Sequence, residues 1–167
     1  MSGLFTVAGV PAHPLLAAAA AVLLPLSAIC SIGLAVHHGA RRRFGWPVLV
    51  LTALAVLAVA LAEASGTQLR DHLGPPDPVL AHHEAISAQL LPWSLGFGVT
   101  VVLLMVAGKL GDRERTAANA RQDAPVSTTW RRISVLASVL VIGMSVVTTV
   151  DVVRIGTTGA QAVWNTH

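Results

Sequence analysis

The run PLLAAAAAVLLPLSAICSIGLAV, from Pro14 to Val36, decides the fold of this chain because it carries no charged residue over its whole length. A helix rises about 1.5 Å per residue, so about twenty apolar residues cover the hydrocarbon core of a bilayer. Pro14 suits the first turn of such a helix, whereas Pro25 predicts a kink inside it. The run therefore predicts a membrane-spanning helix.

The whole chain has the composition of a membrane protein. Of its 167 residues, 54% are hydrophobic and 11% are charged, whereas about a quarter of the residues in a soluble domain are charged. The single cysteine, Cys30, lies inside the first apolar run, which excludes a disulfide framework and a thiolate metal site. The N-terminus lacks the basic start of a signal peptide, so no cleavage is expected.

Three further apolar runs follow, and together the four predict an all-α, four-helix membrane bundle in a single domain over residues 1–167. The predicted spans cover about residues 14–36, 46–64, 78–108 and 133–153. In the third span, Asp77 is a natural N-cap and Pro92 predicts a kink. The first turns of that long helix are expected at or above the membrane interface.

The segments between these spans are predicted as a short basic turn over residues 37–45 and a polar loop over residues 109–132. Gly156 and Gly159 are expected to end the fourth helix, so that Trp164 anchors a tail along the interface. No internal repeat stands out in the sequence. Pairing the first two spans with the last two gives no inverted match, which disfavours an inverted-repeat transporter.

The basic residues predict the orientation of the bundle. Of the eleven lysines and arginines, two fall on the side of the chain termini, at Arg70 and Arg154. The other nine fall in the first and third connections: Arg41, Arg42, Arg43, Lys109, Arg113, Arg115, Arg121, Arg131 and Arg132. Because short cytoplasmic loops are rich in Lys and Arg, we expect a multi-pass protein of the inner (plasma) membrane with both termini outside. The positive charge thus reports topology and does not indicate nucleic-acid binding.

The polar interval EASGTQLRDHLGPPDPVLAHHE, residues 63–84, is the candidate functional region. It collects histidines and carboxylates between two apolar runs, and ionisable residues bordering spans are functional candidates. With both termini outside, His13 emerges on the same side as this interval. His13 and His83 are therefore the leading cofactor ligands, and His72 and His82 are weaker candidates.

Other ionisable residues have structural explanations. His37 and His38 stand beside three arginines on the opposite side, where a solvated role is expected. Asp151 and Arg154, spaced i and i+3 on one helix, are expected to pair with each other. No motif of a known enzyme class is present, so the sequence leaves open whether the protein is an enzyme.

A set of short motifs in a fixed order resembles a known family. They are G-x-P-x-HPLL (9–16), LLPL (23–26), RRR (41–43), ASGTQL (64–69), HHE (82–84), QLLPW (89–93) and VVRIG-x-x-GAQAVW (152–164). This order resembles the bacterial membrane proteins grouped as domain of unknown function 2231, over nearly the whole chain.

The resemblance implies four spans and no settled activity, and some members are fused to cytochrome c-like or Rieske-type domains. It also implies roles for His13, before a proline, and His83, at the start of the third span. Two further histidines of the family pattern are replaced by Ala18 and Thr157.

Two functions from different classes follow as expectations. The first is a redox or electron-transfer module that holds haem b or a transition metal at its outer histidine and carboxylate cluster, with Glu84 or Asp71 as oxygen ligands in the metal case. The alternative is a non-catalytic accessory subunit that docks onto a larger respiratory or transport complex. In both, the lipid bilayer is the surrounding partner.

Overall fold

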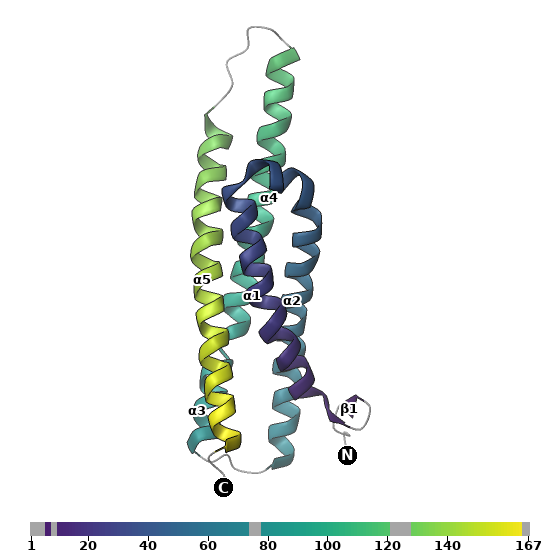
Figure 1. Ribbon diagram of the computed structural model, residues 1–167, viewed down its shortest axis with the longest axis vertical. Helices are drawn as coiled ribbons and strands as arrows, with labels where there is room; N and C mark the ends of the chain where they lie inside the picture. Colours follow the sequence, from purple (N-terminus) through teal and green to yellow (C-terminus); the bar gives the residue numbers. More distant parts are fainter. Residues whose placement is uncertain (1–5, 8–9, 74–77, 121–127, 165–167) are drawn as a thin grey trace.

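The computed structural model describes residues 6–7, 10–73, 78–120 and 128–164 of the chain. Within these residues the fold is all-α, as predicted, apart from an antiparallel pairing of β1 (Thr6–Val7) with β2 (Val10–Pro11). Four helices are long and apolar enough to cross a membrane. The protein is therefore a multi-pass four-helix bundle (Figure 1).

The helices extend beyond the apolar runs that predicted them. They are α1 (Ala12–Val36), α2 (His38–Leu73), α3 (Pro78–Ser87), α4 (Leu90–Ala120) and α5 (Thr129–Trp164). The predicted turn over 37–45 is wrong, because His37 alone separates α1 from α2. The predicted loop over 109–132 is wrong in its first half, which continues α4. Arginine, lysine, alanine and glutamate favour helix, so a helix need not end where its apolar run ends.

The third predicted span is divided into α3 and α4. Pro92 has no N–H to donate to Ala88, and its ring collides with that carbonyl in a continuous helix. The chain turns at Ala88 and Gln89, where the Gln89 amide donates to the Ile86 carbonyl at 3.1 Å. The kink predicted at Pro92 is thus observed as a break one turn earlier. The break makes α3 a separate helix, which packs mainly against α5.

The other prolines and glycines do not interrupt their helices. Helix α1 runs through Pro25, and α5 runs through Gly156 and Gly159 as far as Trp164. The expectation that these glycines end the fourth helix is therefore wrong. A glycine costs a helix about 1 kcal/mol relative to alanine, and the packing of α3 against this part of α5 opposes that cost.

The long helices form a ring in the order α1, α2, α4, α5, so that α1 and α4 lie diagonally opposite. Phe97, Leu24 and Leu104 are completely buried at its centre. Large apolar side chains such as Ile29 and Leu136 face outward and are more than half exposed. This outward-facing apolar surface suits contact with lipid tails.

The two ends of the bundle differ in chemistry. We call one the histidine end: it comprises the start of α1, the last turns of α2 and α5, and α3. We call the other the basic end: it comprises the connection of α1 to α2, the last turns of α4 and the first turns of α5. In Figure 1 the histidine end is at the bottom and the basic end at the top.

Candidate functional site

His13 is held by the neighbouring helix α2. Its Nδ1 atom lies 2.8 Å from the Ala62 carbonyl oxygen, and the side chain is half-buried. A carbonyl oxygen can only accept, so Nδ1 must carry the hydrogen. The imidazole also lies against Gly66, where an added Cβ would come within 2.9 Å of the His13 Cε1 atom. The ring therefore occupies space that only glycine leaves open.

His83 is held in the same manner by α5. Its Nδ1 atom lies 3.1 Å from Thr158 Oγ1. That hydroxyl donates its own hydrogen to the Ile155 carbonyl at 3.0 Å, so it must accept from His83. An added Cβ at Gly159 would come within 3.1 Å of the His83 Cε1 atom.

When neutral, both imidazoles are therefore the same tautomer. With the hydrogen on Nδ1, the lone pair resides on Nε2. Metal-bound histidines usually donate their second ring N–H to a backbone carbonyl, carboxylate or other acceptor, which fixes the ring and raises its basicity. His13 and His83 are therefore both prepared to act as ligands, or as bases, through Nε2.

The segments that hold the two histidines correspond to each other. Helix α2 carries SGTQ at residues 65–68, and α5 carries TGAQ at residues 158–161. When these tetrapeptides are aligned without gaps, buried positions of the two helices coincide along their length. The coinciding pairs are Val48 with Val141, Thr52 with Ser145, Ala55 with Thr148, and Val59 with Val152.

The same correspondence extends to the preceding helices. His13 is followed by LLP at residues 23–25 and His83 by LLP at residues 90–92. Since the ring order is α1, α2, α4, α5, the α1–α2 hairpin lies opposite the pair α4 and α5. The likeness is local: His83 lies on the separate helix α3, and its acceptor Thr158 aligns with Ser65 instead of with Ala62, the acceptor of His13. The prediction that the chain is not an inverted-repeat transporter stays a prediction.

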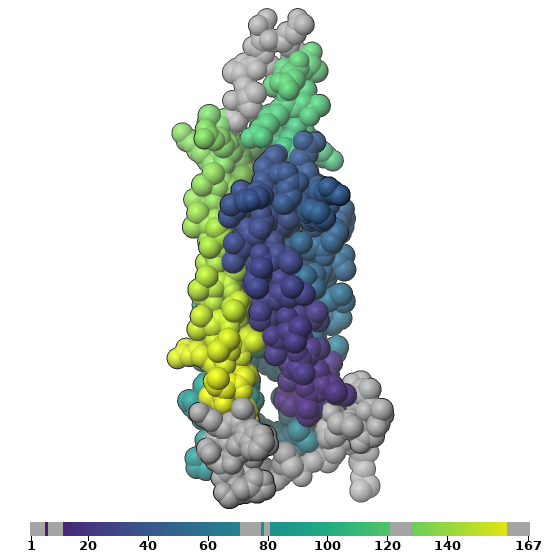
Figure 2. Space-filling model, viewed as in Figure 1, coloured from purple at the N-terminus to yellow at the C-terminus, as the bar shows by residue number. Residues whose placement is uncertain are grey.

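The two histidines approach from opposite sides of the histidine end. His13 belongs to the α1–α2 side and His83 to the α3–α5 side of this end. The space-filling view is hollowed between the start of α1 and the end of α5 (Figure 2). The structure therefore brings the two leading candidates together at one end of the bundle.

Carboxylates complete the polar lining of this end. Arg70 of α2 pairs with Glu84 of α3 at 3.4 Å, which directs that face of α2 toward α3. Glu63 lies two helical turns before Arg70 and so on the same face. Its buried Oε2 atom has no hydrogen-bond partner among the described residues. Glu63 thus supplies a buried acceptor atom on the residue that follows Ala62, whose carbonyl holds His13. The sequence analysis includes Glu63 only as one of several carboxylates of the polar interval.

The remaining predicted residues do not join this pair. His82 is exposed on α3, and the side chains of His72 and Asp71 lie outside the described residues. His38 pairs with Asp112 at 3.1 Å at the opposite end of the bundle.

The fourth helix carries a further difference from expectation. Asp151 and Arg154 are expected to pair with each other, yet the ion pairs seen in the described part of the chain do not include this one.

Nowhere in the described ranges do three or more His, Cys, Asp or Glu side chains lie close enough to hold a metal ion. Comparison of the chain with protein families, curated proteins and solved structures finds no match. The candidate site therefore rests on its own geometry.

Proposed function

We propose that the histidine end binds haem b, which the Nε2 atoms of His13 and His83 would hold, and that the protein serves as an electron-transfer module of the membrane. The observation that carries this proposal is that both imidazoles, when neutral, carry their hydrogen on Nδ1. Each is fixed through Nδ1 to a neighbouring helix, His13 to α2 and His83 to α5, and neither Nε2 atom has a hydrogen-bond partner among the described residues.

The donor set favours haem over a protein-ligated transition metal. Structural zinc sites take four protein ligands and catalytic ones three, and the described residues offer no such group. Haem iron requires at most two axial ligands from the protein. When bound, haem would supply one-electron redox chemistry, and His13 and His83 would hold it in the protein.

The placement of the two histidines adds a geometric reason. His13 is held by α2 and His83 by α5, on opposite sides of the histidine end, and four-helix bundles hold cofactors between facing helices. The glycines beside the rings, Gly66 and Gly159, leave the imidazoles room against the helix backbones. These features support a single site shared by both halves of the chain.

The distribution of basic residues supports the placement of this site on the outer side of the inner membrane, with both termini outside. A redox partner would then approach from that side. The resemblance to domain of unknown function 2231, with its fusions to cytochrome-like domains, supports the same function by association.

The decisive experiment is an absorption spectrum with elemental analysis of the protein purified in mild detergent. We expect a Soret band and stoichiometric iron in the unmodified protein. His13→Ala and His83→Ala should each remove most of the haem, and the double variant should lose little more because both residues serve one site. His82→Ala, an exposed neighbour on the same helix, is the matched control and should retain the haem.

Two outcomes would contradict the proposal. Unchanged iron and haem in both single variants would exclude a shared site. A colourless, metal-free protein that copurifies with a larger respiratory or transport complex would instead favour the accessory-subunit function.

A further inference from the structure

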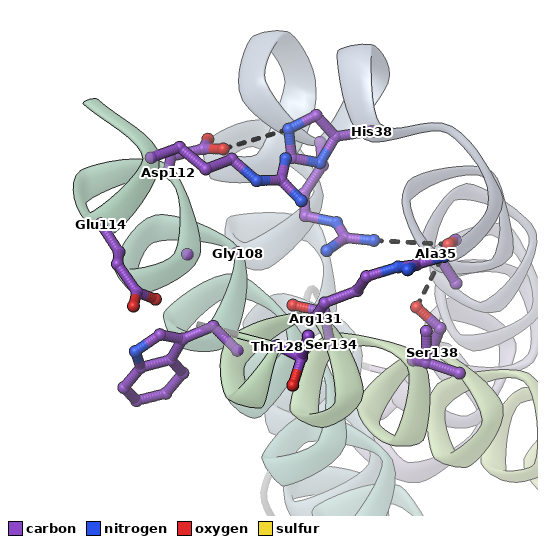
Figure 3. A pocket seen from close by; sticks show the side chains of 14 residues that line it. Ala35, His38, Gly108, Asp112, Glu114, Thr128, Arg131, Ser134 and Ser138 are labelled. Atoms are coloured by element: carbon purple, nitrogen blue, oxygen red, sulfur yellow. Dashed lines mark hydrogen bonds and ion pairs between the residues drawn. The ribbon is translucent and has the colours of Figure 1, made fainter. Parts of the chain in front are cut away.

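A second polar site lies at the basic end, away from the histidines. It is a cavity of about 370 Å³ between the end of α1, the start of α2, α4 and the start of α5. Three arginines line it, Arg41, Arg115 and Arg131, together with two carboxylates, Asp112 and Glu114. Asp112 is already engaged by His38 at 3.1 Å, as Figure 3 shows, and by Arg42 at 3.6 Å. The cavity therefore has a surplus of positive charge.

Arg41 is the buried member of this group, with 8% of its surface exposed. Its Nε donates to the Leu34 carbonyl at 3.1 Å and its Nη2 to the Ala35 carbonyl at 3.3 Å, so it caps the C-terminal end of α1. Gly108 makes room for it, since a Cβ there would come within 3.0 Å of Arg41 Cδ.

The guanidinium of Arg41 takes part in none of the ion pairs found in the described ranges. Asp112 lines the same cavity and attracts this guanidinium electrostatically, but it is already paired with His38 and Arg42. A buried charge is costly unless a counter-charge accompanies it. Arg131 extends from α5 toward Ala35 in the same space (Figure 3), so two guanidinium groups line this cavity and an anion there would complement both.

An apolar groove of about 260 Å³ adjoins this cavity on the outer surface between α4 and α5. Its walls include Leu103, Val106, Leu136 and Leu140. The half-buried Trp130 lines both the groove and the polar cavity. A cationic cavity and an apolar groove on the outer surface thus meet at Trp130.

We propose that this composite site binds an anionic phospholipid from the leaflet that the basic end faces. Its phosphate occupies the cavity beside Arg41 and Arg131, and one acyl chain lies along the groove between α4 and α5. Basic pockets between membrane helices suit anionic headgroups in this way. A free anion would use only the cavity and leave the apolar groove without a role.

Native mass spectrometry of the detergent-purified protein tests this proposal, because it counts the lipids that stay bound. Dioleoyl phosphatidylglycerol is titrated against dioleoyl phosphatidylcholine, which has the same chains without net charge. Glycerol 3-phosphate provides the headgroup without chains. We expect phosphatidylglycerol to bind at least about tenfold more tightly than either, since hydrogen bonds between a phosphate and a guanidinium are stronger than those between neutral groups.

Two arginine variants test whether the lipid binds in the cavity. Arg131→Gln should remove most of the preference for phosphatidylglycerol, and because Arg131 is exposed its loss should leave the fold intact. Arg132→Gln, the exposed neighbour that does not line the cavity, should keep the preference. Equal binding of phosphatidylcholine would overturn the proposal, as would equal binding of glycerol 3-phosphate or an unchanged preference in Arg131→Gln.

Discussion

The Nδ1 atom of His83 lies 3.1 Å from Thr158 Oγ1, and this contact joins α3 to α5 through a hydroxyl that can only accept, because its hydrogen is given to Ile155. The contact determines which ring nitrogen of His83 carries the hydrogen. It also holds a short helix that Pro92 has separated from α4. Thr158 thus fixes both the tautomer and the position of the His83 ring.

Removing this acceptor should weaken the proposed site without unfolding the protein. In Thr158→Val the side-chain shape is kept, but His83 loses the partner that fixes its ring. Loss of such a supporting contact typically lowers ligand affinity about 10–100-fold. We therefore expect the affinity for haem, measured by titrating haem into the detergent-solubilised protein, to fall about 10–100-fold. Thr157→Val is the control, since Thr157 is exposed and donates only within its own helix. Equal losses in both variants would contradict the role of Thr158.

The glycines that face the histidines should be sensitive to one added methyl group. In Gly66→Ala and Gly159→Ala the new Cβ would stand 2.9 Å and 3.1 Å from the imidazoles of His13 and His83, so each ring must move. We expect loss of bound haem with little change in unfolding temperature. Gly156→Ala meets no atom within 4 Å and should keep the haem, with stability equal or higher by up to about 1 kcal/mol. Haem loss in Gly156→Ala as large as in the other two would contradict this explanation.

The orientation of the bundle is tested by labelling introduced cysteines in intact cells, in a Cys30→Ala background. A membrane-impermeant thiol reagent should label cysteines at Gly74 or Thr166 and should not label one at Ala117, because the basic end is expected in the cytoplasm. Labelling at Ala117 alone would reverse the assignment.

The packed centre of the bundle should respond strongly to truncation at Phe97, whose side chain is completely buried. Phe97→Ala leaves a cavity, and such changes cost about 3–5 kcal/mol in soluble proteins. We expect a clear drop in unfolding temperature in detergent. Phe44→Ala removes a ring that is half exposed and should cost far less. Similar effects of the two substitutions would indicate that Phe97 is not at the packed centre.

Much of the fold could be predicted because lipid imposes a simple rule: a long apolar run must form a helix that satisfies its own backbone groups. The run from Pro14 to Val36 therefore specified α1 without reference to any other residue. Helix ends were predicted poorly at the basic segment 37–45 and at Gly156. Outside the hydrocarbon region, charge and glycine do not oblige a helix to stop, and packing against neighbours decides its length.

Four spans, their apolar surfaces and the candidate residues His13 and His83 could be predicted from composition and motifs alone. The diagonal placement of α1 and α4, and the contacts of Ala62 and Thr158 with the two rings, are established only by the packed structure. The physical reason is that helix formation in lipid depends on local composition. The state of an imidazole depends on an acceptor from a helix far along the chain, which only packing brings within hydrogen-bonding distance.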